Sequence, residues 1–142
     1  MDASVIVDAS VWVSWLRPTD INHDASTIWL DQYIASEGHL VEPALLLLEV
    51  AASISRQTGQ AIRAKEAINT LRSISKIQIV PLDSLLLQAA VNVAIDLQLR
   101  AGDALYVALA HQLNIPLVSW DKEQLQRAVS FTKTYTPVSY VF

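Results

Sequence analysis

Short apolar runs rich in β-branched residues alternate along this chain with longer segments whose apolar positions recur every three or four residues. The first pattern predicts buried strands, and the second predicts amphipathic helices. We expect strands at 5–7, 39–43, 76–81 and 115–120, and an edge strand within 130–142. We expect helices at 9–16, 23–38, 44–57, 61–75, 83–99, 103–113 and 122–129. This alternation implies an α/β fold with a parallel sheet that helices cover on both faces.

The composition is that of a folded domain, with 52% hydrophobic residues among 142. No repeat, low-complexity tract or linker divides the chain, so we expect one domain over residues 1–142. The absence of cysteine excludes disulfides and thiol chemistry. The start MDASVIVD has no basic region typical of a secretory signal, and no apolar run reaches the ~18 residues of a membrane span. We therefore expect a cytoplasmic protein.

The net charge of −4 argues weakly against a nucleic-acid partner, although a local patch matters more than the total. Residues 56–76 carry five basic side chains and one acidic side chain. Lys65, Arg72 and Lys76 would stack on one stripe if the helix predicted there extends that far. A solvated face of an amphipathic helix is the simpler interpretation, so this patch alone decides nothing.

Three aspartates occupy positions where a ligand site and a helix cap are both plausible. Asp8 directly follows the first predicted strand and Asp121 follows a later one, so both lie at the sheet edge where ligands bind. Asp103 begins a predicted helix. A cap is the simpler interpretation of each, because an Asp side chain accepts a hydrogen bond from a free backbone N–H. Gln124 strengthens that interpretation for Asp121, since the two residues fit a D-x-x-Q capping box.

Glu49 differs because it lies among apolar residues. Its neighbours at i−4, i−3 and i+3 are apolar: Leu45, Leu46 and Ala52. A buried Glu needs a partner, and desolvation raises its pKa unless a cation or hydrogen-bond donors compensate. The stripe continues through Ser53 to Arg56, which indicates a polar groove. An ion pair with an arginine is the alternative.

Carboxylates that gather without basic partners repel one another, and a hard divalent cation is the usual remedy. Oxygen ligands alone favour Mg²⁺ or Mn²⁺, which can activate water and neutralise charge on a phosphodiester. The sequence has no G-x-S-x-G motif and no P-loop. Its three histidines have no metal-ligand spacing, and we interpret His111, late on an apolar helix, as structural.

Three segments resemble the signature blocks of PIN-domain ribonucleases, specifically the VapC-like toxins of bacterial toxin–antitoxin pairs. The segments are VIVDASVWVSWL (5–16), PALLLLEVAASI (43–54) and AGDALYVALAHQLNIPLVSWD (101–121). They occur in the family's order and spacing and span the chain nearly from end to end. The resemblance implies a three-layer α/β/α fold with a central, mainly parallel sheet. It also implies a Mg²⁺- or Mn²⁺-dependent endoribonuclease that a cognate antitoxin holds inactive.

Carried over by position, the family's catalytic and metal-binding acids are Asp8, Glu49, Asp103 and Asp121. Ser10 matches a small hydroxyl residue near the family's metal site, and Ser119 matches the Ser or Thr two residues before the last acid. The last acid varies among members of the family in type and in importance. We therefore expect Asp121 to contribute less than the other three.

The resemblance also implies a homodimer and an antitoxin segment near the acidic groove. Trp12, Trp15 and Trp29 are an unusual aromatic load for a small domain, and tryptophan is enriched in the cores of interfaces. The alternative, that these rings fill the hydrophobic core, is equally consistent with the sequence. We expect the antitoxin to place a basic side chain against Asp8 and Glu49 and to displace the metal.

Phosphoryl-acceptor domains and non-catalytic binding domains are two alternatives to a ribonuclease. Receiver-type domains need an acidic pair before the first helix, and dehalogenase-type phosphatases need D-x-D. Neither pattern is present, because Asp8 is followed by Ala9 and Ser10. A non-catalytic PIN-like domain that binds RNA or protein remains the open alternative.

Overall fold

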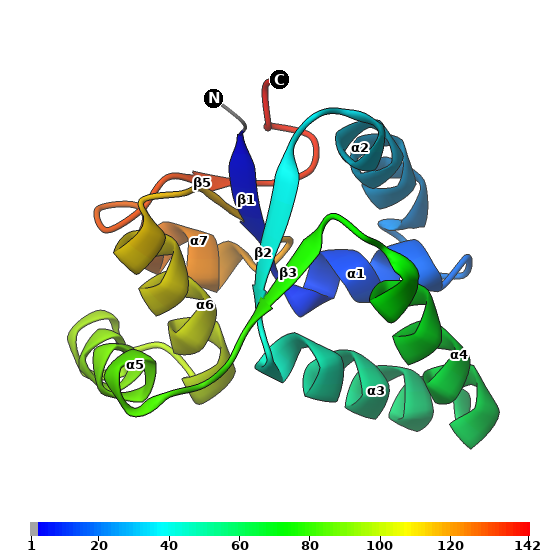
Figure 1. Ribbon diagram of the computed structural model, residues 1–142, viewed down its shortest axis with the longest axis horizontal. Coiled ribbons are helices and arrows are strands. Elements are labelled where there is room, and N and C mark those ends of the chain that lie inside the picture. Colours follow the sequence, from blue (N-terminus) through cyan, green and yellow to red (C-terminus); the bar gives the residue numbers. More distant parts are fainter. Residues whose placement is uncertain (1–2) are drawn as a thin grey trace.

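A computed structural model, which describes residues 3–142, contains one sheet with the strand order β3-β2-β1-β4-β5 (Figure 1). The strands are Ser4–Val7 (β1), His39–Pro43 (β2), Ile77–Val80 (β3), Leu117–Val118 (β4) and Thr134–Tyr135 (β5). Every neighbouring pair is parallel. The expected parallel sheet and the edge strand in the tail are therefore confirmed.

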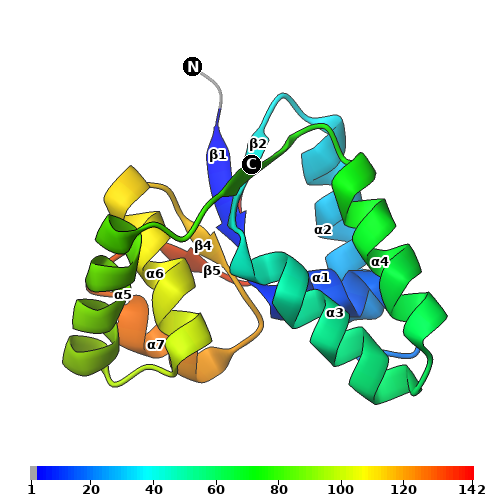
Figure 2. The ribbon, with the colours of Figure 1, turned by 60° about the horizontal axis from the view of Figure 1, so that its bottom comes forward.

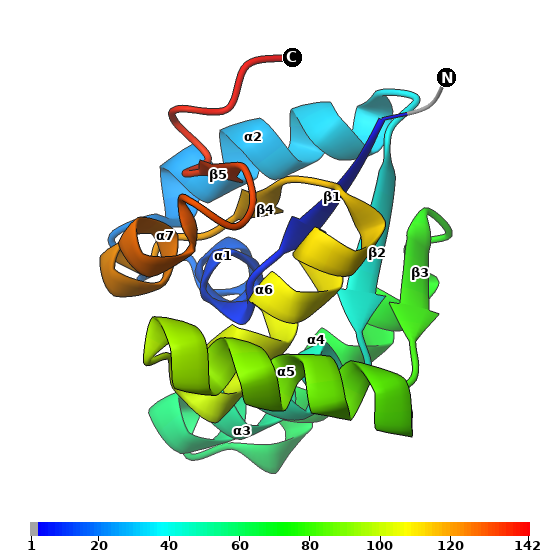
Figure 3. The same ribbon diagram turned by 90° about the vertical axis from the view of Figure 1, so that its left-hand side faces the viewer.

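Helices cover both faces of this sheet and give three layers (Figure 2). The helices are Ala9–Leu16 (α1), His23–Ala35 (α2), Leu45–Thr58 (α3), Ala61–Ser73 (α4), Ser84–Leu97 (α5), Ala101–Leu113 (α6) and Lys122–Ala128 (α7). Helices α1 to α4 pack on one face, and α5 to α7 pack on the other. Figure 3 shows the second group in front of the sheet. Within residues 3–142, no helix is both long and apolar enough to cross a bilayer.

Alternating side chains along β1 explain why both layers form. Val5 and Val7 belong to the hydrophobic core on the side of α1 to α4, whereas Ile6 belongs to the core on the side of α5 to α7. Successive side chains of a strand point to opposite faces, so a short run of β-branched residues supplies both cores at once.

Several boundaries differ from those expected. Helix α6 begins at Ala101 with Arg100 as its N-cap, so Asp103 lies in the first turn and is not a cap. Helix α4 ends at Ser73, which leaves Lys76 outside it; the Lys76 ammonium donates to the backbone oxygen of Ser36 instead. The helix does not extend far enough for Lys76 to join Lys65 and Arg72 on one basic stripe.

The tryptophans expected at an interface lie mainly in the core. Trp12 is fully buried and Trp29 is 3% exposed. Trp29 stacks on Tyr33, with ring centroids 5.3 Å apart. Trp15 is partly buried, and its indole N–H donates to Asp31. The core-filling alternative is correct for Trp12 and Trp29, because both pack in the layer between the sheet and α1 to α4.

Candidate active site

Four carboxylates line one open pocket at the carboxyl end of β1, and three of them are acids expected from the sequence. The pocket has a volume of about 380 Å³. Its acids include Asp8 after β1, Glu49 on α3 and Asp103 on α6. Asp121, after β4, does not line the pocket, but its charge raises the pKa of Asp8 and of Asp103. The topology thus brings residues from four distant segments to one edge of the sheet.

Asp8 caps α1 and also faces the other acids. Its Oδ2 accepts from the backbone N–H of Ser10 at 2.9 Å, as a cap does. Its Oδ1 accepts from Nε2 of Gln124 at 3.4 Å. The side chain is only 6% exposed, and burial raises its pKa more than these hydrogen bonds lower it. Asp8 therefore resists carrying a negative charge unless a cation accompanies it.

Glu49 lies on a polar face of α3 together with Ser53 and Gln57, which also line the pocket. Burial raises its pKa, and the neighbouring hydroxyl of Tyr106 offsets part of the rise. Oε1 of Glu49 has no hydrogen-bond partner. No arginine within residues 3–142 forms an ion pair with it, so the groove interpretation is correct. The groove continues through Gln57, whereas Arg56 does not line the pocket.

Asp103 has a strongly perturbed carboxyl. Burial and the charges of Asp8, Asp121 and Glu49 raise its pKa to about 7, and Arg100 offsets only part of that rise. Near neutral pH this carboxyl therefore exchanges its proton readily, although an exposed Asp is fully ionised there.

Asp121 is the N-cap of α7, as expected, with Oδ1 accepting from the backbone N–H of Gln124 at 3.2 Å. The reciprocal half of the capping box is absent, because the Gln124 side chain turns to Asp8 and to the backbone oxygen of Asp103. The backbone N–H of Asp121 instead donates to Oγ of Ser119. One glutamine thus contacts two of the pocket acids.

The two serines join the segments that carry the first and last acids. Ser10 Oγ lies 3.4 Å from Ser119 Oγ and accepts from the backbone N–H of Trp120 at 3.1 Å. These contacts fix the loop after β4 against the start of α1. The spacing between Asp8 and Asp121 therefore depends on hydroxyl groups that carry no charge.

Glu42 is a buried carboxyl beneath the pocket that sequence reasoning did not single out. Strand β1 pairs with β2 at Ser4 and Val5 and with β4 at Ile6 and Val7. The backbone N–H of Val7 donates to Oε1 of Glu42 at 2.7 Å, which replaces a ladder bond directly before Asp8. Burial raises the pKa of Glu42 well above its usual range. An acid within an otherwise apolar predicted strand was the available signal.

Two further polar groups near the pocket were also missed. Asp20, in the loop before α2, lines the pocket, and its Oδ1 accepts from the backbone N–H of Asn22. Tyr106 lies on α6 beneath the acids, and its hydroxyl has no hydrogen-bond partner of standard geometry. Asp20 lies outside the three signature segments, and Tyr106 lies within the third as one of many apolar positions, so only the folded chain places them here.

The donors of this pocket fit a hard divalent cation in their chemistry. Carboxylate oxygens are the preferred ligands of Mg²⁺, and Oε1 of Glu49 is buried without a partner. Among residues 3–142, however, no three His, Cys, Asp or Glu side chains approach closely enough to form a ready-made metal cluster. Asp8, Glu49 and Asp103 line the same pocket, but their carboxyl groups do not converge on one position.

The sequence matches the PIN domain family over residues 5–130, and the chain belongs to that family. The structure resembles VapC20 of Mycobacterium tuberculosis, described as a sarcin–ricin loop cleaving toxin, with a TM-score of 0.75 at 17% identity. That likeness covers 91% of this chain and 97% of VapC20. No curated protein sequence matches the chain.

Two further solved structures also have this fold. VapBC2 from Rickettsia felis, bound to a promoter DNA fragment, gives a TM-score of 0.72 at 12% identity, covering 94% of this chain and 98% of the other. FitAcB from Neisseria gonorrhoeae gives 0.68 at 17% identity, covering 96% and 99%. The resemblance to VapC-like toxins expected from the sequence motifs is therefore confirmed at the level of the fold.

Gly102 leaves room for the Glu49 side chain, and this gives a first prediction. A Cβ at Gly102 would lie 2.7 Å from Oε2 of Glu49. In Gly102→Ala, the flexible carboxyl must move away while α6 gains a better helix former. We expect unchanged or slightly higher thermal stability, with Mn²⁺ affinity about 10-fold weaker by calorimetry. Glu49→Gln is the matched comparison, and Gly102→Ala binding Mn²⁺ as tightly as the parent would contradict the assignment.

The raised pKa of Asp103 predicts how stability depends on pH without metal. Between its usual pKa of 3.8 and about 7, the unfolded chain loses this proton while the folded chain keeps it. The unfolded state then binds fewer protons, so the free energy of unfolding falls as pH rises through that window and levels off above it. In chelator, Asp103→Asn should show a shallower fall in melting temperature. Parallel curves for parent and variant would refute this expectation.

Proposed function

We propose that the protein is a metal-dependent endoribonuclease that hydrolyses phosphodiester bonds in RNA and acts as the toxin of a toxin–antitoxin pair. The observation that carries the proposal is that Asp8, Glu49 and Asp103 line one open pocket and that none of them has a basic ion-pair partner within residues 3–142. Membership of the PIN domain family supports it. The name of VapC20, a toxin that cleaves the sarcin–ricin loop, supports the choice of RNA.

Asp8, Glu49 and Asp103 would hold a Mg²⁺ or Mn²⁺ ion, with Asp121 as the more distant acid. When bound, such an ion supplies positive charge that acidifies water and offsets charge developing on the phosphate. The carboxyl of Asp103 holds a proton below about pH 7 and has to release it before it can act as a ligand. Metal binding is therefore coupled to proton release.

The remaining residues orient these acids and leave room for the substrate. Ser10 and Gln124 hold the two oxygens of Asp8, so its carboxylate keeps one direction. The rim of the pocket adds the side chains of Ser53 and Gln57 as neutral hydrogen-bonding groups. Trp120 is also among the residues that line the pocket. An aromatic wall suits unpaired bases, which favours single-stranded RNA.

A protein inhibitor and a second copy of the chain complete the proposal. An antitoxin would seat a basic side chain against Asp8 and Glu49, where it would compete with the metal. Because Trp12 and Trp29 are buried in the core, they are not available for a dimer surface. Helix α5 exposes Leu87, Val91 and Ile95 at four-residue spacing, and exposed apolar stripes mark interfaces.

Cleavage assays test the proposal directly. The parent should cleave single-stranded RNA with Mg²⁺ or Mn²⁺ and stop when chelator is added. Asp8→Asn and Asp103→Asn should lose about 100-fold or more in rate while remaining folded, because each removes a ligand. Asp121→Asn should lose less, since its side chain does not line the pocket.

Undiminished cleavage by Asp8→Asn would refute the site. Equal and complete loss in Asp8→Asn and Asp121→Asn would refute the ranking. RNA binding by the parent without any cleavage would instead support the alternative, a non-catalytic PIN-like binding domain.

The partners give a separate prediction. Light scattering should report about twice the 15.7 kDa of one chain, and Ile95→Glu should shift the protein towards that single-chain mass because it places a charge on the α5 stripe. Co-expression of the adjacent small gene should relieve growth arrest and yield a complex. A parent that stays monomeric at high concentration would remove the dimer, and an adjacent gene without effect would remove the antitoxin.

A further inference from the structure

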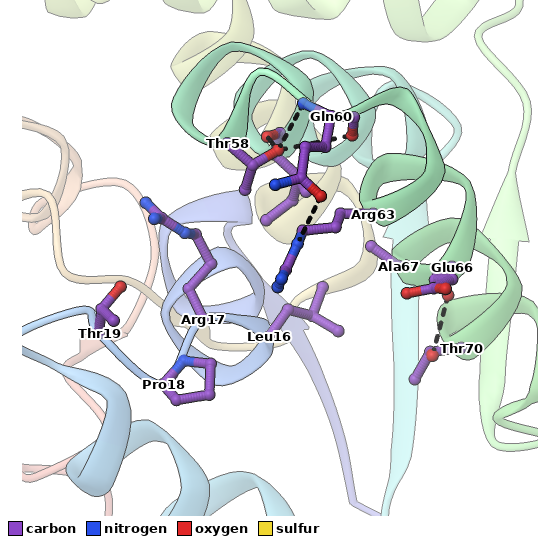
Figure 4. A pocket seen from close by; sticks show the side chains of 11 residues that line it. Leu16, Arg17, Pro18, Thr19, Thr58, Gln60, Arg63, Glu66, Ala67 and Thr70 are labelled. Atoms are coloured by element: carbon purple, nitrogen blue, oxygen red, sulfur yellow. Dashed lines mark hydrogen bonds between the residues drawn. The ribbon is translucent and has the colours of Figure 1, made fainter.

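A second pocket, of about 540 Å³, opens between the end of α1, the end of α3 and helix α4 (Figure 4). Arg17 and Arg63 line it from opposite sides, and both project into the space between α1 and the α3–α4 turn. Thr19, Thr58 and Thr70 belong to the same lining, although the hydroxyls of Thr58 and Thr70 donate to the backbone oxygens of Ile54 and Glu66. The two guanidinium groups are therefore the donors suited to bind an anion with oxygen acceptors.

Neither guanidinium has a charged partner. Arg17 donates to Oε1 of Gln57, and Nε of Arg63 donates to Oε1 of Gln60 at 3.1 Å. Across residues 3–142, neither arginine forms an ion pair. Arginine matches the paired oxygens of carboxylate and phosphate groups, and a neutral amide oxygen uses only one of its donors. Both arginines therefore retain unused binding capacity.

The second pocket is joined to the acidic pocket by a line of side chains on α3. Glu49, Ser53 and Gln57 follow one another at four-residue spacing, so they lie on one face of the helix. Nε2 of Gln57 donates to Oγ of Ser53 at 2.8 Å, and Oε1 of Gln57 accepts from Arg17. Gln57 lines the acidic pocket and Arg17 lines the second one. A ligand that extends along this face of α3 from the acidic pocket would contact the carboxylates first and the guanidinium groups next.

We propose that the Arg17–Arg63 pocket binds a phosphate of the RNA strand beside the phosphodiester that is cleaved at the acidic pocket. This inference rests on the proposed ribonuclease function and adds a substrate subsite to it. A chain with a net charge of −4 and an acidic pocket repels RNA unless cations lie along the strand's path. Arg17 and Arg63 supply those cations next to the cleavage site.

A carboxylate from a partner protein is the other occupant with the required oxygens. The contact path along α3 favours RNA, because it connects the arginines to the pocket where the phosphodiester would react. The lining also includes Glu66, which repels either anion and provides a test of opposite sign. The experiment therefore has to distinguish RNA binding from docking of a partner protein.

The test measures binding of a short, fluorescently labelled single-stranded RNA of mixed sequence by anisotropy, in chelator so that no cleavage occurs. Arg63→Gln and Arg17→Gln should each bind about 10-fold more weakly than the parent. The slope of log affinity against log salt concentration should fall in magnitude by about 0.7 for each variant, because one phosphate contact is lost. Glu66→Gln should bind more tightly.

Arg56→Gln is the matched control, because Arg56 is exposed on α3 and lines neither pocket. It should bind RNA with the parent's affinity and salt slope. Melting temperatures establish that each variant is folded, and Arg63→Gln keeps the test valid if Arg17→Gln does not fold.

Folded Arg17 and Arg63 variants with the parent's affinity and slope would overturn the subsite while leaving cleavage by the parent, and thus the proposed function, intact. The same result combined with lost binding to a co-expressed protein partner would reassign the pocket to protein docking. A parent that neither binds nor cleaves RNA with Mg²⁺ or Mn²⁺ would overturn the proposed function and the subsite together.

Discussion

Repulsion among the carboxylates at the carboxyl end of β1 is the constraint to which the rest of the site responds. Parallel strands end at one edge, so Asp8 and Asp121 arrive there together. Helices α3 and α6 bring Glu49 and Asp103 from opposite faces of the sheet. Burial raises the pKa of Asp8, Glu49 and Asp103, and repulsion among these acids and Asp121 adds to the rise. A proton or a cation relieves this repulsion, so folding prepares the pocket to bind positive charge.

The surrounding structure holds these charges in place and does not neutralise them. Glu42 accepts from the last N–H of β1 and thereby fixes the residue before Asp8. Gln124 contacts Asp8, and Gly102 leaves space for Glu49. Such an arrangement lowers stability near the site in exchange for function, as is common where charged groups are kept apart from counterions. Arg17 and Arg63 lie in the second pocket, beyond Gln57, and so leave the carboxylates of the acidic pocket without a counterion.

The sequence predicts the sheet well because β-branched runs alternate with helical periodicity, and a parallel topology follows from that alternation. The acids were identifiable because each lies next to an element boundary or among apolar residues. Other features depend on long-range packing that no local pattern encodes. Gln124 fits a capping box by spacing, yet its side chain turns to Asp8 because that carboxylate needs a donor. Trp12 and Trp29 are equally compatible with core and interface until the layer above them is known.

The central claim is that the acidic pocket takes up a divalent cation in place of protons. Calorimetric titration of Mn²⁺ into the parent protein just below neutral pH, in buffers of different ionisation enthalpy, measures both binding and proton release. We expect saturable binding with net release of protons, and less release in Asp103→Asn because that carboxyl holds its proton to about pH 7. Absence of binding, or binding without proton release in the parent, would contradict it.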